Sequence, residues 1–109
     1  MFMDDSVRLK HILDAANEAM SLCQSRNRQE LDTDRMLNLS LVRLLEIVGE
    51  AAAGISDEFR QAHPNIPWHQ MTAMRNRLIH GYFDINLDVV WQTVTKDLPP
   101  LIEQIKSII

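Results

Sequence analysis

The segment from Asp32 to Ala53 constrains the fold most, because its apolar residues recur at the three- and four-residue spacing of an amphipathic helix. They form a stripe wider than one neighbouring helix can cover. The segment is therefore predicted to be a helix, ended near Gly54, that lies at the centre of a bundle or is shared with another subunit. The apolar positions are Met36, Leu37, Leu41, Leu44, Leu45, Val48, Ala51 and Ala52.

Two further helices are predicted in the first two thirds of the chain. The segment from Asp5 to Ser25 has the same apolar spacing, with Asp4 available as its N-terminal cap. A polar stretch from Arg26 to Glu30 then forms the connection to the next helix. A short helix opens at Ser56 and must end before Pro64, because a proline disfavours the helical conformation of the residue before it.

Two more helices are predicted after that point. Pro67 suits the first position of a helix that runs towards Gly81. The stretch from Asp84 to Asn86 can cap a last helix, whose interior contains the pair Pro99-Pro100. Because proline has no N–H group, this pair is expected to kink or split the helix. The apolar stripe of the last helix is Leu87, Val90, Trp91, Val94, Leu98, Leu101, Ile102 and Ile105.

The composition agrees with a purely helical fold. Only three glycines occur, and 46 % of the 109 residues are apolar, which is enough for one buried core. The prediction is an all-α, antiparallel bundle of four main helices plus a short helix, in a single domain spanning residues 1–109. Cys23 is the sole cysteine, and its helical apolar spacing predicts a buried core thiol.

The charge balance limits how the chain can meet nucleic acid. Its net charge of −4 argues against a surface that coats nucleic acid generally. RNA contact would have to be local, carried by a few arginines in a cleft; alternatively, a basic partner uses the acidic surface. No secretory apolar segment opens the chain, and no apolar run approaches the ~18 residues of a spanning helix. A cytoplasmic location without membrane contact is expected.

The pattern with most chemical meaning is Arg75, four residues, His80, one residue, Tyr82. Arginine grips phosphate with a permanent charge, and histidine exchanges a proton near neutral pH. The combination suggests phosphodiester chemistry. On an ideal helix Arg75 and His80 lie about 140° apart, but Gly81 places His80 in the final turn, where the backbone unwinds. The end of a helix also favours a cationic imidazole.

Plainer roles are equally compatible with this spacing. His80 can simply hydrogen-bond the end of its helix, and Arg75 and Arg77 can be surface charges paired with acids. Tyr82 can pack the turn against the core. The spacing alone leaves these alternatives open.

Two glutamates on the second main helix also have two interpretations. Glu46 and Glu50 lie four residues apart, and Arg43 precedes Glu46 by three. This spacing is typical of ion pairs on a helix surface. Alternatively, one of the glutamates holds Arg75 or Arg77 in position within a cleft.

Gly49 is interpreted as a point of close approach between helices rather than a binding residue. The histidines outside the motif show no metal-ligand spacing among themselves, and only one cysteine is present. No metal site is therefore expected.

Several segments, in order and over nearly the whole chain, resemble the HepT-like branch of the HEPN superfamily, the toxin half of HepT–MNT toxin–antitoxin pairs. The joint occurrence of these segments is specific. They are residues 8–13, 43–52, 56–60, 66–68, 74–83 and 90–91.

This resemblance implies a metal-independent endoribonuclease on a HEPN-like bundle that forms a homodimer, with two motifs facing each other across the dimer cleft. Arg75 would hold the scissile phosphate of an mRNA or tRNA substrate, and Asn76 would orient the phosphate or the imidazole. His80 would be the general base or acid, and Arg77, Glu46 and Glu50 are supporting candidates. Two histidines in a dimer would supply both the acid and the base.

The resemblance also implies a type VII-like toxin–antitoxin system. An MNT-type nucleotidyltransferase antitoxin would add AMP to Tyr82, blocking RNA through bulk and negative charge. The partner would use ATP and Mg²⁺, whereas this chain would need no cofactor. Two alternatives remain: a non-catalytic subunit that presents substrate or nucleotide to the nucleotidyltransferase, and a dimeric bundle in which the motif is structural.

Overall fold

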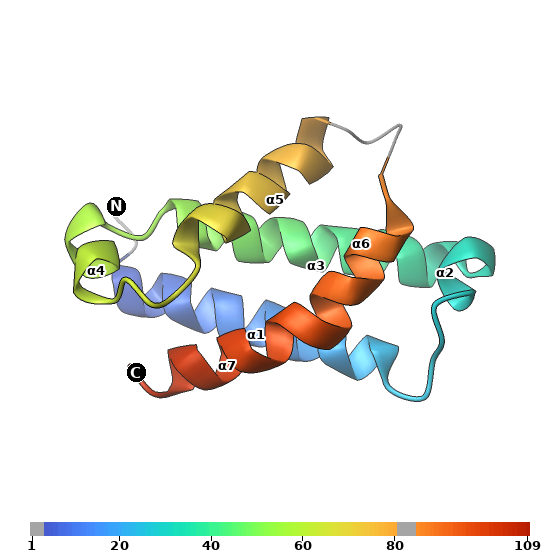
Figure 1. Cartoon of the computed structure of the whole chain (residues 1–109), viewed down its shortest axis with the longest axis horizontal. Helices are drawn as coiled ribbons and strands as arrows, with labels where there is room; N and C mark the ends of the chain where they lie inside the picture. Colours follow the sequence, from blue (N-terminus) through green and yellow to red (C-terminus); the bar gives the residue numbers. More distant parts are fainter. Residues whose placement is uncertain (1–3, 81–84) are drawn as a thin grey trace.

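Helices account for all regular structure in residues 4–80 and 85–109, which the computed structural model describes (Figure 1). The expected all-α bundle is confirmed, with three long helices and a last composite helix as its four main members. A short helix, α4, follows α3 as predicted. The elements are α1 (Asp5–Cys23), α2 (Glu30–Thr33), α3 (Arg35–Ala53), α4 (Asp57–Ala62), α5 (Trp68–His80), α6 (Leu87–Gln92), the π-helix η1 (Thr93–Asp97) and α7 (Leu98–Lys106).

Helix α3 is the centre of the bundle, as its wide apolar stripe predicts. It runs antiparallel to α1 and packs against α1, α2, α5 and α6 (Figure 1). Seven of the eight stripe residues are buried. Met36 is the exception, with 80 % of its surface exposed, and nearby Leu39 is 53 % exposed. No described element of this chain covers that side of the first turns of α3, so the alternative that the helix is shared with another subunit stays a prediction there.

Side-chain caps begin four of the helices. The predicted cap of α1, Asp4, and the predicted start of α4 at Ser56 are confirmed. Asn86, which caps α6, lies within the predicted capping stretch, and α3 begins after its cap Asp34, where it was expected to begin. Each capping oxygen accepts a hydrogen bond from a backbone N–H of the first turn. The capping pairs are Asp4 with Val7, Asp34 with Leu37, Ser56 with Phe59, and Asn86 with Asp88 and Val89.

The connection between α1 and α3 differs from the predicted one. Helix α1 ends at Cys23, earlier than expected, and Ser25 then adopts a left-handed φ of 61°. The additional helix α2 lies between α1 and α3. Arg26 stabilises this region by pairing with Glu30 at 2.6 Å and with Asp34 at 3.0 Å. Both contacts join polar side chains, so the apolar pattern gave no sign of them.

The last helix is neither split nor regular. The hydrogen-bond pattern changes over η1, directly before the first turn of α7, which contains Pro99 and Pro100. There the N–H of Leu98 donates to the carbonyl oxygen of Thr93, five residues back rather than four. The missing N–H groups of the prolines account for the change. Helix α6 packs on α3, whereas η1 and α7 pack on α1. In the described ranges, no helix has the length and apolar content needed to cross a membrane.

Candidate active site on α5

Helix α5 carries the motif and lies across α3 (Figure 1). Its start is fixed by the indole N–H of Trp68, which donates to the carbonyl oxygen of His63 at 3.0 Å. His80 is the last residue of α5, so its predicted place in the final turn is confirmed. Gly81 and Tyr82 lie outside the described residues.

Arg75 sits where α5 and α3 approach most closely. A Cβ atom added to Gly49 of α3 would collide with the Cβ of Arg75 and lie 2.6 Å from the carbonyl oxygen of Met71. The interpretation of Gly49 as a point of close helix approach is confirmed. The backbone of α5 at Arg75 therefore rests directly on α3.

The guanidinium group of Arg75 is half-buried and lacks a carboxylate partner among the described residues. Its Nη1 donates to Oδ1 of the neighbouring Asn76 at 3.0 Å. Its Nε is buried without a partner in the described part of the chain. A permanent charge with spare donors is suited to a phosphate group.

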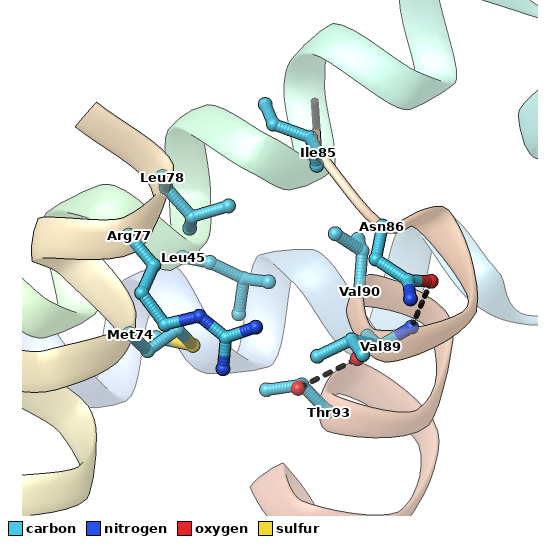
Figure 2. Close-up of a pocket in the computed structure, with 9 residues that line it drawn as sticks. All are labelled: Leu45, Met74, Arg77, Leu78, Ile85, Asn86, Val89, Val90 and Thr93. Atoms are coloured by element: carbon cyan, nitrogen blue, oxygen red, sulfur yellow. Dashed lines mark hydrogen bonds between the residues drawn. The ribbon is translucent and has the colours of Figure 1, made fainter. Parts of the chain in front are cut away.

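Arg77 serves a different surface from Arg75. Two residues along a helix correspond to a rotation of about 200°, so the two side chains leave α5 on nearly opposite flanks. Figure 2 shows the Arg77 side chain extending from α5 towards α6, with its guanidinium group near Val89 and Thr93. There it lines a cavity of about 90 Å³, whose walls also include Leu45 of α3. The motif arginines therefore do not form one cationic cluster within a single chain.

The two glutamates predicted to support the site, Glu46 and Glu50, do not contact Arg75 or Arg77 through ion pairs in the described part of the chain. Glu46 accepts a hydrogen bond from Arg43 at 3.2 Å, the surface pair that the spacing of three allows. Glu50 is exposed. Neither glutamate forms an ion pair with Arg75 or Arg77 within the described ranges, so a positioning role for them stays a prediction.

Arg77 was predicted as a supporting residue of the same cleft as Arg75, and its separate setting was not predicted. The helical spacing of Met74, Arg77 and Leu78 was the available signal, because residues three and four apart share one face. Asp97 lies on the same side of the molecule, in the π-helical segment, and no sequence pattern singled it out. In the described ranges, no three His, Cys, Asp or Glu side chains are grouped as metal ligands would be.

Comparison with known proteins decides the family. The Ribonuclease HepT-like family matches residues 12–108, nearly the whole chain. This chain belongs to the HepT-like ribonuclease family. The expected family is thus confirmed, along with the helical fold.

Two curated relatives of this HepT-like chain are similar to it over most of their own length. One, named "Probable ribonuclease HepT", comes from Thermococcus cleftensis and is 38 % identical over 96 residues, covering 84 % of this chain and 87 % of the relative. Another, named "Putative RNase TTE0752", comes from Caldanaerobacter subterraneus subsp. tengcongensis. It is 36 % identical over 101 residues, covering 93 % and 90 % of the two chains. No solved structure matches.

Proposed function

We propose that this HepT-like chain is a metal-independent endoribonuclease that cleaves RNA at a site shared by two subunits. The observation that carries the proposal is the setting of Arg75. Its backbone is fixed against Gly49 of α3, and its guanidinium group has no carboxylate partner among the described residues. His80 follows at the end of the same helix, about 7.5 Å further along the axis.

The reaction requires one base and one acid. An imidazole of His80 takes the proton of the ribose 2′-hydroxyl, and the 2′-oxygen attacks the adjacent phosphorus. The bond from phosphorus to the 5′-oxygen breaks, and this oxygen receives a proton from a second imidazole. The products are a 2′,3′-cyclic phosphate and a 5′-hydroxyl. Arg75 stabilises the negative charge on the phosphate oxygens during the attack.

A homodimer would supply the second imidazole. Helix α5 is helical from Trp68 to His80, so Arg75 and His80 lie about 140° apart on one chain. A facing α5 from a second copy would complete both sites. Exposed apolar side chains support such a contact: Met36 and Leu39 on α3, and Ile79 on α5.

As the proposed toxin of a type VII-like HepT–MNT pair, the chain would be neutralised by its nucleotidyltransferase antitoxin. Transfer of AMP from ATP to the Tyr82 hydroxyl, with release of pyrophosphate, would place a bulky anion two residues from His80. The added charge would repel the RNA backbone. The proposal rests on the position of Tyr82 in the motif.

Substitution of His80 tests the catalytic role. The purified chain with His80→Ala should lose RNA cleavage and growth inhibition, whereas His69→Ala, an exposed histidine on the same helix, should retain both. Wild-type cleavage should persist in EDTA and leave 2′,3′-cyclic phosphate ends. Equal cleavage by the wild type and the His80→Ala variant would reject the mechanism.

The net charge of −4 favours one alternative, a non-catalytic subunit of a minimal nucleotidyltransferase. In that case the chain alone would neither cleave RNA nor stop growth. It would instead raise the rate at which the nucleotidyltransferase uses ATP. Measuring both activities with purified proteins separates the two functions.

A further inference from the structure

A groove of about 670 Å³ runs along the Arg77 side of α5, between that helix and the η1–α7 segment. Buried apolar residues line it, including Val48, Met71 and Leu101. The smaller cavity drawn in Figure 2 shares Met74, Arg77, Val89 and Thr93 with this groove, so the two lie side by side. The volume falls in the range of sites for small organic ligands, roughly 300–1,000 Å³.

Two unpaired charges border this groove. Arg77 and Asp97 are both exposed, and neither forms an ion pair with the other or with another described residue. Neutral amide side chains complete the polar lining, among them Gln70 and Gln104. A cation, an anion and amides around an apolar floor can bind a ligand that has both a phosphate and a flat polar ring.

We propose that this groove binds one nucleotide of single-stranded RNA next to the cleaved bond, with its phosphate on Arg77 and its base against the apolar floor. The inference rests on the proposed ribonuclease function. Arg77 precedes His80 by three residues, which is about 4.5 Å along the helix axis and about 60° around it, so the groove begins within one turn of His80 and on its side of α5. Unpaired RNA bases are bound in this way, by packing on side chains and hydrogen bonds to their edges.

Asp97 gives the groove a preference among bases. Its carboxylate repels phosphate, so the backbone is held at the Arg77 end and the base extends towards Asp97. A carboxylate accepts hydrogen bonds from exocyclic amino groups, which adenine, cytosine and guanine have and uracil lacks. Uridine is therefore disfavoured in the groove.

The shape of the groove favours a nucleotide over a helix of a partner protein. Nε2 of Gln104 on α7 donates to the carbonyl oxygen of Asn65, in the loop before α5, at 3.2 Å. Both residues line the groove, so their hydrogen bond joins its two walls at the end away from His80. A partner helix would need a trough that is open at both ends.

Binding and cleavage by single-residue variants test the inference. In the His80→Ala background, fluorescence anisotropy would measure binding to labelled oligomers of A, C and U of equal length. Arg77→Gln should weaken binding to all of them about tenfold and lower the salt dependence by about one phosphate contact. Asp97→Asn should abolish a fivefold or greater preference for A and C over U. Arg35→Gln and Asp14→Asn are exposed controls on other surfaces.

The cleavage assay separates failure of this inference from failure of the proposed function. Wild-type cleavage sites in a random-sequence RNA should be depleted of uridine at one flanking position, and Asp97→Asn should restore it. Cleavage with an unchanged profile in both groove variants would reject the groove and leave the ribonuclease standing. Selective binding of the oligomers without cleavage of RNA would support the groove and reject the ribonuclease function. The absence of RNA binding, or loss of antitoxin binding alone in the variants, would also overturn the inference.

Discussion

Gly49 of α3 lies directly against the backbone of Arg75 on α5, with no space for a side chain between them. Gly49→Ala should therefore destabilise the fold, although alanine normally favours a helix by up to ~1 kcal/mol over glycine. The new methyl group would meet the Cβ of Arg75 and the carbonyl oxygen of Met71, which cannot rotate away. We expect a loss of about 1–3 kcal/mol, measured by urea unfolding, and reduced RNA cleavage as Arg75 shifts.

Gly54→Ala is the matched control for that substitution. Its added methyl group would meet the guanidinium group of Arg8, the far end of a flexible side chain. Its φ of −88° also suits alanine. A loss as large as that of Gly49→Ala would contradict the argument that rigid atoms of α5 make position 49 special.

Arg60 should be a strong determinant of stability. Its guanidinium group donates to the carbonyl oxygens of Ala52, Ala53 and Ile55 at 2.8–3.1 Å, which satisfies the end of α3. Arg60→Ala would leave these acceptors to water, with an expected loss of about 1–3 kcal/mol in the free energy of unfolding. Arg60→Lys should recover only part of it, because an ammonium group lacks the planar fork. Full recovery with lysine would show that charge alone matters.

The contact between Asp5 and Ser56 predicts a pH-dependent contribution to stability. Hydrogen bonds from the Ser56 hydroxyl, at 2.6 Å, and N–H, at 2.9 Å, lower the pKa of the Asp5 carboxyl below its ordinary 3.8. A lowered folded-state pKa means that the stabilisation is complete above the unfolded-state value and is lost as pH falls through the folded-state value. The side chain is only partly buried, so solvent screens the interaction and the effect is small.

Asp5→Asn tests this contribution. The wild type should be more stable than the variant at pH 7, and the difference should shrink below pH 4, as measured by urea unfolding. Asp14→Asn, on the exposed side of α1, should show no such trend. A constant difference across this range would indicate that the amide replaces the carboxylate poorly for steric reasons alone.

Cys23 should react slowly in the folded protein. Burial raises the pKa of its thiol, so the nucleophilic thiolate is scarcer than in a free cysteine. With Ellman's reagent at pH 8, native chain should react many times more slowly than chain unfolded in urea. Equal rates would place the thiol at the surface and contradict the predicted core position.

Local chemistry made much of the fold predictable. Caps such as Asp4 and Ser56 act on the N–H groups two or three residues ahead, so the sequence alone locates them. Helix α2 was not predictable in that way, because Arg28 reaches Asp88, sixty residues away, to hold this region against α6. Its stability depends on contacts that exist only once the chain has folded.

The candidate site was predictable to the level of residues and no further. Helical periodicity separates Arg75 from Arg77 around α5, but it does not say which flank meets α3 and which faces a groove. The close approach of Gly49 to Arg75 determines which flank of α5 faces α3, and it depends on the shapes of the two helix surfaces. Asp97 lines the groove from the π-helical segment, whose changed hydrogen-bond pattern the apolar periodicity does not reveal.

The π-helical segment lets one stripe in the sequence serve two partners. From Leu87 to Ile105 the apolar residues keep a strict α-helical period, so an unbroken α-helix would present them all in one direction. A residue added to one turn rotates everything after it by about 100°. Because of this phase shift, α6 packs against α3 while α7 packs against α1. The π-helical turn before the two prolines thus sets the rotation of α7 relative to α6. Deleting one residue from Thr93–Asp97 would turn the apolar side of α7 away from α1.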